Sequence, residues 1–220
     1  FTVRRSVNNR KFGQTAIKYT MFNVIKLIRN NDLMTLALNL TKEVEQIDES
    51  WEGVWNFGLH RMNRKFVKHL LSRISSYLDN LIGKDTTYVN YHHPNGRQFE
   101  IEHLWADKFE EHTDEFEQKN DFQAWRNSVG ALILLPQGTN QSFNSDKYED
   151  KLEHYIKENI YAQTLHPGYY LKNPNFLKSE TIKQLEFDAH PHFKKDDIGK
   201  RQKLVQRICE KLWSVEYFNL

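Results

Sequence analysis

The hydrophobic positions in the N-terminal part of the chain recur at helical spacing, which predicts a series of helices. One stripe runs through residues 14–29 at Ile17, Met21, Val24 and Ile28. A second stripe runs through residues 61–83 at Met62, Phe66, Leu70, Ile74 and Leu81. A third helix is expected over residues 31–44, with Asn31 or Asp32 as its N-cap. We expect these stripes to face the core rather than a binding partner.

The pattern changes after Gly83. Two β-prone runs flank the sequence HPNGR, and Asn-Gly is a strong signal for a hairpin turn. We therefore expect a β-hairpin over residues 87–103. An acidic segment follows and is expected to be helical to about Asn120. The apolar run VGALILLP, which Pro136 ends, is typical of a buried strand.

The C-terminal part returns to helical spacing. We expect a helix within residues 143–160, with Ser145 or Asp146 as its cap, and an amphipathic helix over residues 196–213. The hydrophobic stripe of the second helix is Ile198, Val205, Ile208 and Leu212. A loop rich in Pro, Gly and Asn, residues 165–176, lies between the two. These elements together predict the α+β class, mainly helical.

The composition is that of an ordinary water-soluble globular protein, with 39% hydrophobic and 27% charged residues. At 220 residues the chain can bury a sizeable core, as one large domain or two small ones. No hydrophobic run approaches the ~20 residues that a membrane helix needs, so we expect no membrane partner. The single cysteine, Cys209, excludes an internal disulfide framework and suits a cytoplasmic location. Its helical context indicates a small buried residue rather than a nucleophile.

The net charge of +2 conceals a segregation of charges along the chain. Residues 1–31 contain seven Lys or Arg and no acid, whereas residues 106–121 contain seven acids and two lysines. A second basic stretch carries Arg61, Arg64, Lys65, Lys68 and Arg73. Basic faces of this kind neutralise phosphates, but an ordinary solvated helix surface has the same appearance in a sequence.

The sequence FEIEHLWADKF, residues 99–109, places a carboxylate directly before a histidine at the end of an alternating run. Such a pair is often only the end of a strand. A second interpretation is catalytic, because hydrolysis of a phosphodiester needs a base for the attacking water and positive charge for the transition state. A single divalent cation beside a histidine base meets both needs. The order of elements allows it: Glu102-His103, a short strand, then Asn140 and Asn144 before a helix.

These residues carry a resemblance to a known family. The segments IEHLW, RNSVGALILLP and TNQSFNSDKYEDKL resemble the HNH-type (His-Me finger) nuclease domain of the GmrSD type IV restriction enzymes. The segments TVRRSVNNR and DDIGKRQKLVQRICEKLW extend the resemblance over nearly the whole chain, although the central part is the diagnostic one. The SspE-type antiphage proteins, which sense phosphorothioate DNA, have a related C-terminal domain.

The resemblance implies a role for each residue of the motif. His103 would be the general base, Glu102 a metal ligand and Asn140 the second ligand, and Asn144 and Lys151 would order the loop or meet a phosphate. Ligands of this kind are oxygens without thiolates, so the expected ion is Mg²⁺ or Mn²⁺.

Two departures from the family pattern concern the surroundings of the base. The family's Gly-Asn-Leu segment reads Gly130-Ala131-Leu132 here, so its middle Asn is absent, and Asn127 is a candidate to replace it. The proline that follows the His motif in the family is also missing.

The resemblance implies an α+β fold with a ββα-metal core and a β-hairpin, embedded in N- and C-terminal helices. We expect a basic helical part at residues 1–85, the nuclease core at 86–165 and a packing loop and helix at 166–220, in one compact domain. Because the chain begins at Phe1 in mid-pattern, we also expect it to be the C-terminal fragment of a longer protein with an N-terminal NTPase or sensor domain.

The expected function is a metal-dependent DNA endonuclease of a bacterial restriction or antiphage system, acting on phage or modified DNA. Its expected DNA contacts are Arg4, Arg5, Arg64, Lys65, Arg126 and Arg201. One alternative is a catalytically degenerate module of the same fold that binds modified DNA or a partner domain. A weaker alternative is an all-helical regulatory protein.

Overall fold

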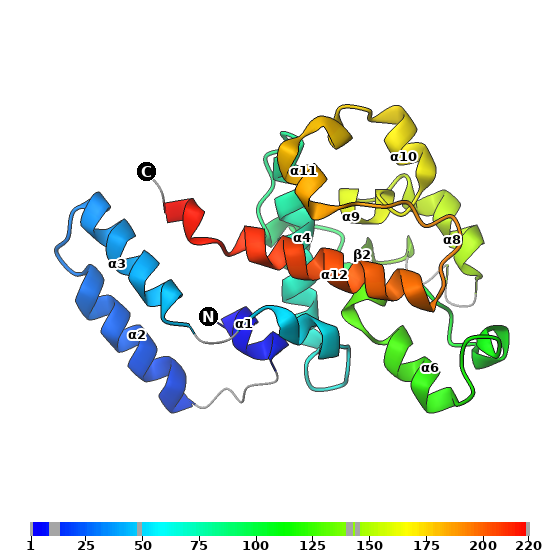
Figure 1. The fold of residues 1–220 in the computed structure, drawn as a ribbon, viewed down its shortest axis with the longest axis horizontal. Coiled ribbons are helices and arrows are strands. Elements are labelled where there is room, and N and C mark those ends of the chain that lie inside the picture. Colours follow the sequence, from blue (N-terminus) through cyan, green and yellow to red (C-terminus); the bar gives the residue numbers. More distant parts are fainter. Residues whose placement is uncertain (1, 9–13, 48–49, 140–142, 144–145, 219–220) are drawn as a thin grey trace.

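The computed structural model describes residues 2–8, 14–47, 50–139, 143 and 146–218, and it is mainly helical (Figure 1). The α-helices in this part of the chain are α1 Thr2–Val7, α2 Gln14–Ile28, α3 Leu33–Glu45, α4 Arg64–Leu81, α5 Val89–His92, α6 Lys119–Arg126, α8 Tyr148–Tyr155, α9 Ile160–Gln163, α10 Pro167–Lys172, α11 Glu180–Leu185 and α12 Lys195–Leu212. The 3₁₀ helices are η1 Glu52–Asn56, η2 Phe109–His112, η3 Val129–Ala131, η4 Phe176–Lys178 and η5 Val215–Phe218. The α+β class is confirmed, since the helices accompany a two-stranded sheet.

The sheet pairs two strands that are distant in the sequence. Strand β1 (Phe99–His103) runs antiparallel to β2 (Leu132–Pro136), with His103 opposite Leu132 at one end. Both faces of the sheet are covered, because consecutive residues of β2 are fully buried. The strands exclude the all-helical alternative.

The β-hairpin expected over residues 87–103 is wrong. Its first arm forms the short helix α5, and β1 takes β2 as its partner instead. The side chain of Asn90 accepts hydrogen bonds from the backbone N–H and the hydroxyl of Thr87, and the Tyr91 hydroxyl donates to Asp79 on α4 at 2.7 Å. The bonds of Asn90 within the segment and the contact of Tyr91 with α4 together override the β-propensity of the segment.

Helix α4 forms the centre of the core. Leu70 and Ile74, from the middle of its predicted stripe, have no exposed surface, whereas Met62 precedes the helix and is 88% exposed. Helix α12 crosses α4 and extends across the front of the molecule in Figure 1. Its predicted stripe is confirmed, because Ile198, Val205 and Ile208 are fully buried.

Helices α2 and α3 pack against one another and stand apart from the main body (Figure 1). Both helices were predicted, and the Asp32 side chain caps α3 by accepting from the backbone N–H of Thr35. The expectation that their stripes face the core is wrong, since none of their described side chains is buried and Met21 is 52% exposed.

Helix α12 is held against η3 at a close approach. A Cβ added to Gly130 would collide with the carbonyl oxygen of Ile198, so only glycine allows the two backbones to come this close. Arg201 then donates from Nε to the Gly130 carbonyl oxygen at 3.1 Å. The last long helix therefore supports the turn that leads into β2.

The helices that the structure describes include none that is long and apolar enough to cross a membrane.

Candidate active site

His103 lies at the end of β1, where its imidazole meets Asn127 from the end of α6. His103 Nε2 and Asn127 Oδ1 are 2.9 Å apart. The amide nitrogen of Asn127 donates to the Gln123 carbonyl oxygen at 2.8 Å, so the amide oxygen faces the ring. An amide oxygen accepts only, and Nε2 must therefore carry the proton. The other ring nitrogen, Nδ1, then has a lone pair and no hydrogen-bond partner among the residues described.

Positive charge surrounds this neutral ring. Burial is the main cause that lowers the pKa of His103 to about 4, and the nearby charge of Arg126 lowers that pKa further. Lys151 and Arg64 act in the same direction, whereas the hydrogen bond with Asn127 opposes them. Arg126 is itself held in place by donating from Nε to the Trp105 carbonyl oxygen at 3.1 Å.

Glu102 points to the other side of the strand and forms a buried ion pair. Lys151 Nζ lies 2.7 Å from Glu102 Oε1 and donates a second bond of 2.7 Å to the His103 carbonyl oxygen. Lys151 is 1% exposed and comes from α8, which places that helix across the Glu102 side of the sheet. Of the two roles expected for Lys151, the burial favours ordering the strand end over meeting a phosphate.

Of the two expected metal ligands, Glu102 is the one that the structure describes. The described residues contain no group of three or more His, Cys, Asp or Glu that could hold a metal ion, so Glu102 would act with ligands of other kinds. Its charged form is stabilised by Lys151 and by a hydrogen bond from the His103 backbone N–H, although burial outweighs both. Burial raises the pKa of Glu102 because it disfavours the charged carboxylate, and a cation at Oε2 would offset that penalty. The two expected ligands or loop residues Asn140 and Asn144 lie outside the described residues.

The expected DNA contacts separate into exposed and buried residues. Arg64 and Lys65 are exposed at the start of α4. Arg4 and Arg5 are half-buried, and the Arg4 guanidinium lies 4.9 Å from the Trp51 ring centroid. The expectation for Arg201 is wrong, because this residue is 1% exposed and stacks on the Tyr161 ring at 4.3 Å.

A comparison with protein families identifies the family of this chain. The family model of the C-terminal domain of GmrSD restriction endonucleases matches residues 46–208, well over half of the chain. The chain belongs to this family. A search of curated proteins and a search of solved structures both gave no match. Helices α1 to α3 precede the matched region, whereas His103, Asn127 and Lys151 all lie within it.

The structure of this GmrSD C-terminal domain shows what surrounds the first departure, the alanine at position 131. Ala131, which stands where the family has Asn, is fully buried, and its carbonyl oxygen accepts from the Leu104 N–H at 2.9 Å. Asn127 contacts the histidine directly, in the manner expected of a substitute. Asn127 is the C-cap of α6, and its contact with the end of β1 is tertiary, so a single sequence shows it only as a nearby Asn.

The lowered pKa of His103 predicts the pH dependence of any reaction in which this ring is the base. For free enzyme, kcat/KM should keep its value down to about pH 4, instead of falling near the ordinary histidine value of about 6.5. Folding favours the neutral ring, because the pKa of His103 is about 4 in the folded chain and about 6.5 in the unfolded chain. This histidine therefore leaves the free energy of unfolding unchanged above about pH 6.5 and lowers it as the pH falls from 6.5 toward 4.

The variant Asn127→Asp tests whether His103 is the base. A carboxylate beside Nε2 stabilises the imidazolium, so the acid limb of the kcat/KM profile should move from about pH 4 toward 6.5. Asn173→Asp is the matched control, since Asn173 also ends a helix and donates to the carbonyl oxygen four residues before it. An acid limb near 6.5 in the wild type would contradict the assignment.

Proposed function

We propose that this domain is a metal-dependent DNA endonuclease of HNH type, acting in restriction or antiphage defence on phage or modified DNA. The observation that carries the proposal is the bond between His103 and Asn127. It fixes the tautomer of a ring that stays neutral, so Nδ1 is a base at the pH of a cell. Membership of a restriction endonuclease family supplies the substrate class.

The proposed reaction uses this base on a water molecule. Nδ1 of His103 takes a proton from the water, whose oxygen attacks the phosphorus. The bond to the leaving oxygen breaks, and that oxygen keeps the electron pair and takes a proton from bulk water. The Nε2–H bond to Asn127 persists through the transfer and keeps the charged ring in place. Arg126 and Arg64 add positive potential where the phosphate gains negative charge.

A cation held by Glu102 would polarise the phosphate and neutralise its charge. Mg²⁺ and Mn²⁺ suit a carboxylate oxygen, and Asn140 remains the proposed second ligand. We further propose that residues 86–165 form the ββα-metal core, that residues 1–85 and 166–220 pack around it, and that an N-terminal NTPase or sensor domain in the same cytoplasmic protein controls it.

A second candidate function is binding without cleavage. It is favoured by the Lys151 ammonium, which occupies Glu102 Oε1 and repels a second cation nearby. Buried Ala131 in the place of the family's Asn points the same way.

Incubation of the purified protein with supercoiled plasmid tests the two functions against each other. The nuclease should produce open-circular or linear DNA with Mg²⁺ or Mn²⁺ and none in EDTA. A binding module would shift the plasmid in a gel and leave it supercoiled under both conditions.

The start of α4 is expected to contact the DNA backbone. Replacing Arg64 and Lys65 together with alanine should weaken binding to all sequences alike and lower the slope of log affinity against log salt by about two. Fluorescence anisotropy at several salt concentrations measures both quantities. The double variant Lys172→Ala, Lys178→Ala removes two exposed charges near the opposite end of α4 and should change neither. An unchanged slope in the first variant would make Arg64 and Lys65 ordinary solvated residues.

A further inference from the structure

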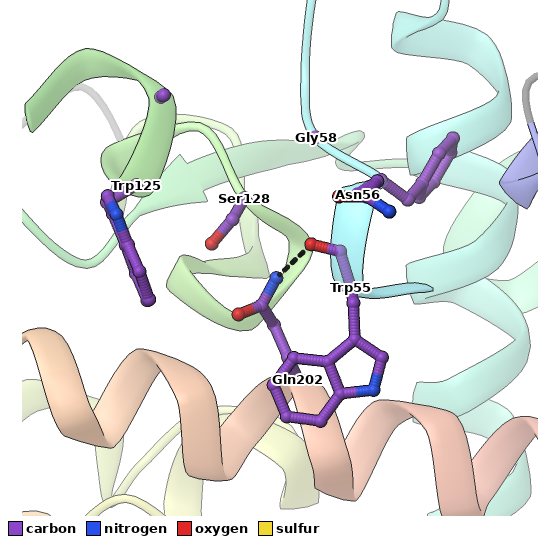
Figure 2. A pocket seen from close by; sticks show the side chains of 8 residues that line it. Trp55, Asn56, Gly58, Trp125, Ser128 and Gln202 are labelled. Atoms are coloured by element: carbon purple, nitrogen blue, oxygen red, sulfur yellow. Dashed lines mark hydrogen bonds between the residues drawn. The ribbon is translucent and has the colours of Figure 1, made fainter. Parts of the chain in front are cut away.

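A cavity of about 520 Å³ opens between η1, α6 and α12 (Figure 2). Its volume is in the range of about 300 to 1,000 Å³ that small-ligand sites occupy. The lining includes two tryptophans, Trp55 and Trp125. Trp55 is 44% exposed, and its indole is oriented by a bond of 2.7 Å from Nε1 to Gln206 Oε1. An exposed indole held in a fixed position is suited to stacking on a flat ring.

Polar atoms without partners lie between the two indoles in Figure 2. Gln202 is 4% exposed and donates from Nε2 to the Trp55 carbonyl oxygen at 3.0 Å, which turns its amide oxygen away from that contact. No residue in the described ranges donates to this oxygen. The Ser128 hydroxyl is buried and likewise has no hydrogen-bond partner in the part of the chain described. Buried polar groups are normally satisfied, so the Ser128 hydroxyl points to a ligand, and the amide oxygen of Gln202 offers the same ligand an acceptor.

The same backbone segment carries the cavity wall and the support of the base. Trp125 and Ser128 line the cavity, and Asn127 between them bonds to His103. The segment is tied to the chain after η1, because the Leu59 N–H donates to the Asn127 carbonyl oxygen at 2.6 Å and the Val129 N–H to that of Phe57 at 3.0 Å. A group bound in the cavity would therefore contact the segment that positions His103.

We propose that the cavity receives a nucleobase turned out of the DNA helix, adjacent to the phosphodiester that is cut; this rests on the proposed nuclease function. Stacking on aromatic side chains and hydrogen bonds to the base edge are the means by which proteins hold an extruded base. The Gln202 oxygen accepts only, so it favours a base with an exocyclic amino group, and the Ser128 hydroxyl can donate to a ring nitrogen. These partners favour adenine or cytosine over thymine.

Binding to duplexes that contain one abasic position tests the proposal. The base opposite that position has no partner and leaves the stack at low cost. In EDTA, so that no cutting competes, fluorescein-labelled duplexes with an orphan A, C, G or T are compared with a fully paired one. The wild type should bind the orphan A or C duplex about tenfold more tightly than the paired and orphan T duplexes. All orphan duplexes carry the same abasic position, so they differ from one another in the identity of the orphan base.

Variants of the walls assign the preference to the cavity. Trp55→Ala and Trp125→Ala should remove the preference while leaving affinity for paired DNA unchanged, and Trp55→Phe should retain most of it. Tyr19→Ala, an aromatic residue that is 65% exposed on α2, is the matched control and should keep it. Equal affinity of the wild type for all duplexes, or a preference that survives in both alanine variants, would overturn the proposal.

The outcome separates this proposal from the nuclease function. Plasmid nicking without a preference for orphan bases would contradict the proposed base pocket and support the nuclease function. A preference without nicking supports the pocket and removes the nuclease. A failure to bind any DNA overturns both.

Discussion

Replacement of His103 by alanine should lower the rate of plasmid nicking by about 10²- to 10⁴-fold, the usual contribution of a general base. The reason is the lone pair on Nδ1, which no neighbouring side chain can replace. Glu102 is bound to Lys151 on the other side of the strand, and Arg126 donates from Nε to the Trp105 carbonyl oxygen. The single-turnover rate at saturating protein, measured with and without Mg²⁺, isolates the chemical step from binding.

The histidine variant needs controls for folding and for DNA binding. Thermal melting should show a fold close to that of the wild type, and anisotropy should show unchanged affinity for DNA. His192→Ala is the matched variant, because this side chain is 77% exposed and pairs with exposed Glu149. Nicking at the wild-type rate by the His103 variant would remove the base assignment.

The largest effect on stability is expected at the buried ion pair. Lys151→Met leaves the Glu102 carboxylate, which is 7% exposed, without its partner. Breaking a buried pair from one side costs about 3 to 5 kcal/mol of unfolding free energy. In a chain of this size that corresponds to a fall in Tm of about 6 to 20 °C. Urea unfolding and calorimetry measure the two quantities.

The double variant Glu102→Gln, Lys151→Met should recover most of the loss, because the uncompensated charge is then gone. Lys183→Met is the control for loss of a lysine in an ion pair, since the Lys183–Glu180 pair is exposed and such pairs contribute about 0 to 1 kcal/mol. A Lys151 variant as stable as the control would show that Glu102 is not held as a buried anion.

The parts of the fold that followed from the sequence are those in which one hydrophobic pattern determines one element. The stripes of α4 and α12 and the apolar run of β2 have a single way to bury their side chains. The hairpin could not be predicted correctly, because residues 87–92 satisfy their apolar positions equally well as a helix on α4. The exposed stripe of α2 shows the same limit, since periodicity identifies a face but not what covers it.

The candidate site divides in the same way. The motif identified His103, Glu102 and Lys151, because their order and spacing are local features of the chain. The contact of Asn127 with His103 and the burial of Arg201 depend on how α6 and α12 pack, which no spacing records. The cavity is the extreme case, as its lining comes from three elements that together span more than a hundred residues of the chain.

The bond from Arg201 to Gly130 has a consequence for the order in which the protein is synthesised. The strand that carries His103 and the turn that carries Asn127 leave the ribosome before the helix that supports the turn. A chain released before residue 195 would lack α12 and the contact that holds η3 in place. An incomplete translation product would then carry His103 without the support of the turn that positions it, and would lack the geometry on which the proposed cleavage depends.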